Sequence, residues 1–204
     1  MSTKKILIDV GTNYVLNKHS LYDIVHCIEP NPEICKYLRE NTNYIVHELA
    51  IDNFIDKRSF GISKIMEGHQ KMGCSSLYEF TDEENGWTRA RDDFQFTKKI
   101  EVDVITMKKF IEDNNIEYIT YFHCDAQGSD LNILKSFDEY INIVEAGQIE
   151  VANKVQLYKD VDNTFDSAVQ FLTDHNFEIT SWDSINKVKE HKPEIDIQFK
   201  RKLV

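Results

Sequence analysis

The chain of 204 residues lacks a long hydrophobic run, and its first residues lack the apolar core of an export signal. Positive charge is also scarce, because 24 Lys and Arg residues stand against 35 Asp and Glu residues and leave a net charge of −11. Nucleic-acid binding depends on clustered basic side chains, so RNA and DNA are not expected partners. These absences predict a soluble, cytoplasmic protein without a membrane span.

Paired cysteines of the Cys-x-x-Cys type are missing as well. The four cysteines have neither the spacing of a zinc site nor the density of a disulfide scaffold, and they are expected to be buried thiols: Cys27, Cys35, Cys74 and Cys124. His19 and the other scattered histidines share no metal-ligand spacing and are expected at the surface or in strands. The chain is long enough for one domain with a full core, and a single domain over 1–204 is expected.

Apolar runs of strand length alternate with segments of helical period, which predicts an α/β fold with a mostly parallel sheet and helices on its faces. Two strands joined by a polar loop at the end of the chain predict that the sheet closes with an antiparallel pair. The expected strands are 4–10, 23–29, 44–51, 118–125, 142–151, 177–184 and 194–201, with a hairpin arm from 58–63 and 98–105. The expected helices are 31–42, 106–115, 129–140 and 163–176, with Thr106 as a cap.

Four acids fall at predicted strand ends: Asp9, Glu29, Asp125 and Glu150. The ligands of open α/β sheets bind beyond the carboxyl ends of the strands. One such acid alone would be an ordinary solvated residue, whereas four at the same edge indicate a functional rim.

Glycine is too sparse to make that rim a dinucleotide site, because Gly61 is the next glycine after Gly11. A pyrophosphate needs several glycines close together at a helix N-terminus. The spacing of Asp9 and Glu29 thus offers an acid that could bind a ribose, but no glycine-rich loop that could bind phosphates. This combination disfavours the nicotinamide cofactor of an oxidoreductase and favours S-adenosylmethionine, a nucleoside without phosphates. The competing interpretation is a strand-turn-helix with a single turn glycine and chance acids.

Several blocks of the sequence resemble the FkbM family of S-adenosylmethionine-dependent methyltransferases. In chain order they are IDVGTN, CIEPNPE, ELAIDN, GCSSL, VDVITMKKFI, HCDAQGSDLNILK and GQIEV, over roughly residues 5–151. The resemblance implies a Rossmann-like class I methyltransferase with a mostly parallel seven-stranded sheet, a final antiparallel strand and helices on both faces.

The resemblance also implies a cofactor site. Glu29 would take the ribose hydroxyls, Asp9 and Asn13 would line the methionine end, and the segment around Ile51 would lie on the adenine side. The full set of implied cofactor residues is Asp9, Gly11, Thr12, Asn13, Glu29, Pro30, Asn31, Ala50, Ile51, Asp52, Ser75, Ser76, Asp125 and Gln127, with Gly128 in the same block as the last two.

Two features depart from the family pattern. The turn continues into the bulky stretch NYVLNKHS instead of a small residue and a long helix, and the first strand begins within five or six residues of the start. The short start fits a minimal enzyme, or a domain of a longer chain that builds and decorates glycans.

Methyl transfer to a hydroxyl needs a positioned base as the proton leaves. The candidates at the rim are Asp125, Glu150 and His123; the two acids could instead bind a divalent cation such as Mg²⁺. For His123, a packed or cofactor-contacting histidine is the alternative interpretation. The long segment 61–97 would select the acceptor or would be a solvated acidic loop, and it holds His69, Tyr78, Trp87, Arg89 and Arg91.

The function expected from these residues and the resemblance is O-methylation of a sugar in a glycan or glycosylated metabolite. Methylation of another small-molecule hydroxyl or amine is the alternative among enzymes. A Rossmann-like binding module that has lost turnover is the alternative of another class, and the bulky residues after the first turn favour it.

Overall fold

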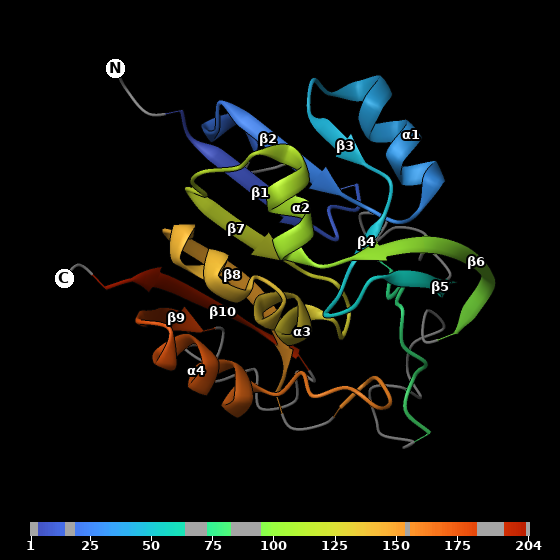
Figure 1. The fold of residues 1–204 in the computed structure, drawn as a ribbon. Helices are drawn as coiled ribbons and strands as arrows, with labels where there is room; N and C mark the ends of the chain where they lie inside the picture. Colours follow the sequence, from blue (N-terminus) through green and yellow to red (C-terminus); the bar gives the residue numbers. More distant parts are fainter. Residues whose placement is uncertain are drawn as a thin grey trace.

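The structure is a computed structural model that describes residues 4–14, 19–63, 73–82, 95–153, 156–182 and 194–202. Its main feature is a seven-stranded sheet in the order β3-β2-β1-β7-β8-β10-β9 (Figure 1). The strands are β1 (Ile6–Val10), β2 (Ile24–Ile28), β3 (Ile45–His47), β7 (Tyr121–Cys124), β8 (Ala146–Ala152), β9 (Phe177–Trp182) and β10 (Glu194–Arg201). The first five run parallel to one another, which confirms the predicted α/β fold with a mostly parallel sheet.

The position of the last strand differs in detail from the prediction. β10 runs antiparallel to both β8 and β9 and lies between them, so β9 forms the edge of the sheet. The burial pattern explains this order, because Ile195, Ile197 and Phe199 of β10 are buried while Glu178 and Thr180 of β9 are exposed. The strand with the more apolar face takes the interior position.

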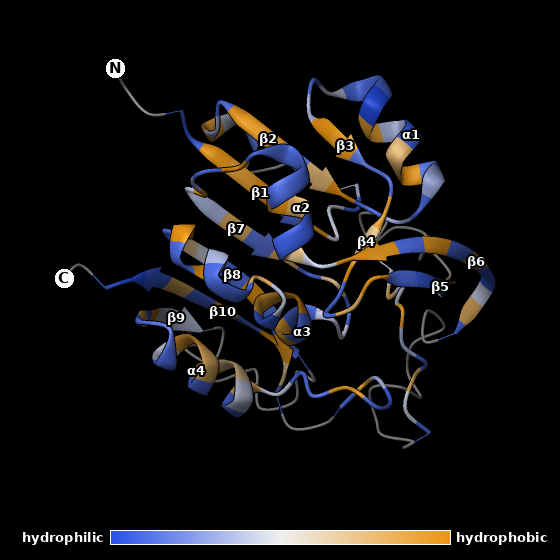
Figure 2. Cartoon of the chain, in the orientation of Figure 1, coloured by the Kyte–Doolittle hydropathy of each residue, from blue (hydrophilic) through white to orange (hydrophobic). Residues whose placement is uncertain are grey.

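Helices cover both faces of the sheet. α1 (Pro32–Asn41) packs through Ile34 and Leu38 on Leu7 and Val25. The other face, around Ile8, is covered by α2 (Met107–Asn114), α3 (Asp130–Lys135) and α4 (Phe165–Asp174). Figure 2 shows the strands β1 and β2 as largely hydrophobic and the helices as mixed, as expected for amphipathic helices that pack on a sheet.

The helix starts agree with the sequence. Asn31 accepts a hydrogen bond from the backbone N–H of Glu33 and caps α1, with Pro32 at the first helical position. Thr106 caps α2 in the same way. The helix expected over 129–140 is shorter, because a 3-10 helix, η3 (Asp138–Ile143), follows α3 and Asp138 has a φ of 53°. An α-helix cannot continue through this left-handed conformation.

The third predicted strand, 44–51, is divided between two sheets. β3 stays in the main sheet, while β4 (Ala50–Ile51) pairs with β6 (Phe96–Ile105) in a second sheet of order β4-β6-β5. β5 (Asp56–Ser63) and β6 pair antiparallel, as the predicted hairpin arm requires. The division places the second sheet beside the carboxyl ends of β1 and β2 (Figure 1). None of the described helices is both long and apolar enough to cross a bilayer.

Candidate functional site

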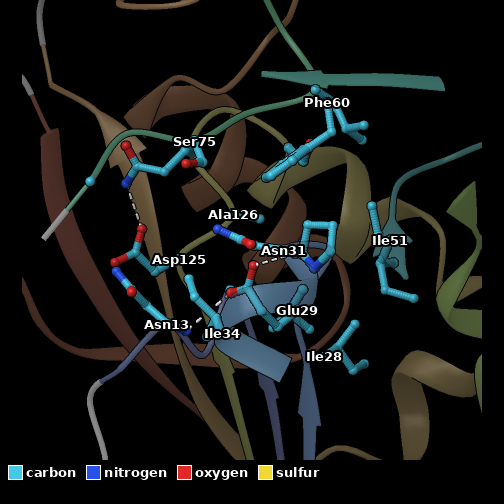
Figure 3. Close-up of a pocket in the computed structure, with 18 of the residues that line it drawn as sticks. Asn13, Ile28, Glu29, Asn31, Ile34, Ile51, Phe60, Ser75, Asp125 and Ala126 are labelled. Carbon is cyan, nitrogen blue, oxygen red and sulfur yellow. Dashed lines mark hydrogen bonds between the residues drawn. The ribbon is translucent and has the colours of Figure 1, made fainter. Parts of the chain in front are cut away.

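A pocket lies at the carboxyl ends of β1, β2 and β7 and extends to the second sheet (Figure 3). It encloses about 760 Å³ of empty space, part of it open to solvent. Ten of the residues that the resemblance assigned to the cofactor line it: Gly11, Asn13, Glu29, Pro30, Asn31, Ala50, Ile51, Ser75, Asp125 and Gln127. Of the four acids expected at the strand ends, Glu29 and Asp125 line this cavity, whereas Asp9 and Glu150 do not.

Gly11 allows two turns to meet at the pocket. Its φ is +74°, and a Cβ atom at this position would lie 2.0 Å from the carbonyl oxygen of Asp125. Only glycine combines this backbone conformation with such a close approach. The turn after β1 is therefore in contact with the turn after β7, and Asn13 comes to lie beside Asp125 (Figure 3).

Glu29 is the buried acid of the pocket, with 5% of its surface exposed. Its Oε1 accepts a hydrogen bond from the backbone N–H of Asn31 at 2.8 Å, and its Oε2 accepts one from the N–H of Asn13 at 3.2 Å. Burial raises the pKa of Glu29 to about 7, although these two bonds favour the charged form. A carboxylate held in this way keeps lone pairs that can accept hydrogen bonds from a pair of hydroxyls.

The pocket is apolar at one end and polar at the other. Figure 3 shows Phe60 and Ile51 on one side and Asn13 and Asp125 on the other. Sequence reasoning missed most of the apolar wall, which consists of Val10, Ile28, Ile34, Leu49, Phe60, Ile62 and Leu77. The signal that could have found Phe60 and Ile62 was the predicted hairpin arm, but the sequence does not show where that arm packs.

Gln127 connects the acids at the polar end. Its Nε2 donates to Asp125 Oδ1 at 2.6 Å and to Glu150 Oε2 at 2.8 Å, and its Oε1 accepts from the Tyr158 hydroxyl at 2.6 Å. Burial, and after it the charge of Asp125, raises the pKa of Glu150 well above its ordinary value. Asp125 lines the pocket, whereas Glu150 and His123 do not, and Glu150 is joined to it through Gln127.

Asp9 lies away from the pocket, with 3% of its surface exposed. Its Oδ2 contacts His19 Nε2 at 2.6 Å and its Oδ1 contacts His123 Nδ1 at 2.7 Å. Burial alone would raise the pKa of Asp9, but hydrogen bonds and charge interactions with His123 and His19 together lower it. For His123, burial alone would lower the pKa, but the bond to Asp9 and the charges of Asp9 and Asp125 raise it to about 9.

His19 was expected at the surface or in a strand, and the structure buries it in η1 (His19–Leu21). The prediction failed because its partner, Asp9, is ten positions earlier in the chain and the pairing depends on the path of the connection. Both carboxylate oxygens of Asp9 therefore contact histidines, and neither faces the cavity.

Three other residues of the implied cofactor set lie behind the pocket. Thr12 donates to the backbone carbonyl of Asp9 at 2.9 Å. Asp52 accepts from the Tyr78 hydroxyl and from Ser129, both at 2.9 Å. Ser76 donates to the backbone carbonyl of Gln127 at 2.6 Å. All three are buried and fix the loops that carry the lining residues, so their contribution to the pocket is indirect.

The expected cation pair, Asp125 and Glu150, already shares the amide of Gln127. Among the described residues, a group of three donors with metal-like proximity occurs elsewhere, at Asp9, His19 and Cys27, whose donor atoms lie within 4.8 Å of one another. There, Asp9 and His19 are in direct hydrogen-bond contact. A cation at either place would have to replace hydrogen bonds that the protein makes on its own.

Tyr78 is the described member of the five residues named in the segment expected to select the acceptor. His69, Trp87, Arg89 and Arg91 lie outside the described residues, as does the bulky stretch 15–18. Tyr78 is described, and its hydroxyl donates to Asp52 and accepts from Asn132 at 2.9 Å. Tyr78 thus supports the loop behind the pocket.

Comparison with known proteins identifies the family. The model of the Methyltransferase FkbM domain matches residues 9–179. The chain belongs to the FkbM methyltransferase family. Membership of this family supports an S-adenosylmethionine-dependent methyltransferase and implies S-adenosylmethionine as the cofactor.

One solved structure is similar in outline. It is a protein from Listeria monocytogenes that is provisionally assigned as an S-adenosylmethionine-dependent methyltransferase, with 11% sequence identity and a TM-score of 0.47. The alignment covers 98% of this chain and 92% of that one. A search of curated proteins found no match to the sequence.

Proposed function

We propose that this FkbM-family protein binds S-adenosylmethionine in the pocket and transfers its methyl group to a hydroxyl of a sugar. The observation that carries the cofactor placement is Glu29, a buried carboxylate that two backbone N–H groups hold at the pocket. The ribose hydroxyls would donate to Glu29, and the adenine would lie against Ile51 and Phe60 on the apolar side.

The polar side suits the methionine part of the cofactor. When bound, S-adenosylmethionine supplies a methyl group that a sulfonium cation makes electrophilic. Asp125 lines this side and offers negative charge close to the cation, and Asn13 offers an amide to the amino-acid group. The pocket is thus complementary in polarity to the whole cofactor.

Among the three candidate bases, the geometry favours Asp125. It lines the pocket, whereas Glu150 and His123 do not. Burial raises the pKa of Glu150 well above its ordinary value. The bond to Asp9 raises the pKa of His123 to about 9, so His123 is protonated near neutral pH and cannot accept the hydroxyl proton. Asp125 would orient the acceptor O–H, and its carboxylate would take the proton as the oxygen attacks the methyl carbon.

An amine acceptor is the second candidate, because the same end of the pocket carries a cluster of acids. The Asp125 carboxylate lines the pocket and would attract a cationic ammonium group, in keeping with the net charge of −11. Sugar as the acceptor class is an expectation from the family resemblance, and the acid cluster by itself fits both acceptors.

The test combines binding with turnover. Calorimetric titration with S-adenosylhomocysteine establishes the cofactor site, and a mass-shift screen of sugars, alcohols and amines establishes the acceptor. We expect methylated sugars, with a rate reduced about 100-fold or more in Asp125→Asn. The control is Asp103→Asn, because Asp103 is exposed on β6 and should leave the rate unchanged.

Two outcomes would contradict this proposal. Transfer to amines alone would contradict the hydroxyl acceptor and support the amine acceptor. Cofactor binding without transfer to any acceptor would favour a binding module. A rate that rises with added Mg²⁺ and falls with chelator would place a cation in the role that we give to the Asp125 carboxylate.

A further inference from the structure

The sheet has a second polar region on the face opposite to α2, α3 and α4. Side chains alternate along a strand, so neighbours of the buried Phe122, Ile149 and Ile197 point to the other face. Three of these neighbours, together with Ser181 of β9, form what we call the polar strip: His123, Gln148, Gln198 and Ser181. Their Cα atoms pair in register from strand to strand, His123 with Gln148, Gln148 with Gln198, and Gln198 with Ser181.

Hydrogen bonds order the side chains of the strip. Ser181 Oγ donates to Gln198 Oε1 at 2.9 Å, and Gln198 Nε2 donates to Gln148 Oε1 at 3.3 Å. At the other end, the bond to Asp9 holds the ring of His123 by its Nδ1 atom. The amides therefore have a fixed direction across three strands, which is unlike a row of independently solvated side chains.

Gln148, Gln198 and Ser181 lie on strands that pair antiparallel, where one face of a sheet is commonly polar, whereas His123 lies on a strand with parallel neighbours on both sides. Gln148 is only 9% exposed, and a buried amide costs free energy unless it is hydrogen-bonded. The described helices do not lie here, because α2, α3 and α4 pack on the opposite face and α1 packs over β2 and β3. The amides of Gln148 and Gln198 bond to each other, so a ligand would contact the strip mainly through the partly exposed Gln198 and Ser181.

Aromatic and acidic groups border the strip. Tyr121 is two residues before His123 and points to the same face, with the ring of Tyr22 at 6.3 Å from its own. Asp196 lies close enough to act on both Tyr121 and His123 electrostatically. An apolar ring and amide groups together match a sugar ring, whose C–H face is apolar and whose hydroxyls both donate and accept.

The strip also leads to the methyl-transfer pocket. Glu150 is two residues beyond Gln148 on the same face, and Gln127 joins Glu150 to the pocket-lining Asp125. The strip crosses four strands, or about 14 Å at the usual strand spacing. A ligand with one hydroxyl at Asp125 could therefore extend along the strip with further rings.

From these contacts we infer that the polar strip is an acceptor subsite, which binds a neutral saccharide of more than one ring across β7, β8, β10 and β9. The inference rests on the proposed methyl transfer to a sugar and specifies how the acceptor is held. It requires Gln198 and Ser181, which are remote from the pocket lining, to contribute to acceptor affinity and not to cofactor affinity.

The test uses the full chain on an array of defined neutral glycans, with and without saturating S-adenosylhomocysteine, followed by titration of the best-bound oligosaccharide and its monosaccharide. We expect the oligosaccharide to bind more tightly. Gln198→Ala and Ser181→Ala should each weaken its binding about fivefold, the effect of one lost hydrogen bond, with unchanged affinity for S-adenosylhomocysteine. Gln170→Ala is the matched control, because Gln170 is exposed on α4 and should leave glycan binding unchanged.

Each outcome separates the two proposals. Binding that neither strip variant weakens in folded protein would overturn the subsite, as would cofactor binding without binding of any glycan. Binding of charged glycans alone would overturn the neutral class. If S-adenosylhomocysteine does not bind, the proposed function fails, and the array read without it still decides whether the strip binds a saccharide.

Discussion

Asp9 and Glu29 are two buried acids at the ends of adjacent strands, and they differ in their hydrogen-bond partners. Both are at least 95% buried, and both were expected at the cofactor. Asp9 is bonded to two histidine side chains, whereas Glu29 is bonded to two backbone N–H groups and faces the pocket. The comparison teaches that the partners of a strand-end acid, and not its position alone, decide whether it can serve a ligand.

The largest expected effect comes from breaking the Asp9 cluster. Asp9→Asn should lower the free energy of unfolding by about 3–5 kcal/mol, because it removes the buried carboxylate that pairs with the half-buried His123 and contacts the buried His19. Urea denaturation measures this loss. Folded Asp9→Asn should retain affinity for S-adenosylhomocysteine within about fivefold, and a much larger loss would show that Asp9 contacts the cofactor.

The Asp9–His123 pair and Glu29 should both contribute stability that is lost as the pH rises, but over different pH ranges. The pKa of His123 is raised to about 9, so the stability from its pair with Asp9 is complete below pH 6.5 and is lost as the pH rises to about 9. The pKa of Glu29 is raised to about 7, so its ionisation costs stability, from nothing below pH 4.5 to roughly 3 kcal/mol above pH 7.

Denaturation of wild type, His123→Gln and Glu29→Gln between pH 4.5 and 9 measures both contributions. Relative to Glu29→Gln, the wild type should become less stable as the pH rises to 7. Relative to His123→Gln, it should lose its advantage between pH 6.5 and 9. A flat difference for either variant would contradict the pairing described for that residue.

For cofactor affinity, the change at Glu29 should have a larger effect than the change at Asp9. Glu29→Gln should weaken S-adenosylhomocysteine about 30-fold at pH 8, because two charge-assisted hydrogen bonds to the ribose become neutral ones. Calorimetric titration gives the affinity. If the variant binds as tightly as wild type, the ribose is held elsewhere.

The smallest expected effects come from changes at the adjacent serines, Ser75 and Ser76. Ser75 lines the pocket, whereas Ser76 is buried and donates to Gln127. Ser75→Ala should weaken cofactor binding by up to about fivefold, whereas Ser76→Ala should leave that affinity unchanged. Each change should cost about 1 kcal/mol of stability, because Ser75 accepts from the backbone N–H of the buried Ser63 and Ser76 donates to Gln127. Thermal denaturation with and without S-adenosylhomocysteine distinguishes them, and equal effects of both changes on affinity would remove the distinction.

The sequence could place Glu29 and Asp125 because strand ends follow from local hydrophobic patterns. It could not separate Asp9 from Glu29, since the separation depends on His19 and His123, one reached through a connection and the other through a neighbouring strand. The division of residues 44–51 was missed because the apolar run is continuous, while its second half pairs with β6, about 50 positions later. The apolar wall at Phe60 depends on the same long-range pairing.

The central claim is that Glu29 serves the cofactor while Asp9 serves His19 and His123. A crystal structure with S-adenosylhomocysteine tests it most directly. The account predicts ribose hydroxyls within hydrogen-bond distance of the Glu29 carboxylate and Asp9 still between its two histidines. A cofactor that contacts Asp9, with His19 or His123 displaced, or a ribose that makes no contact with Glu29, would contradict it.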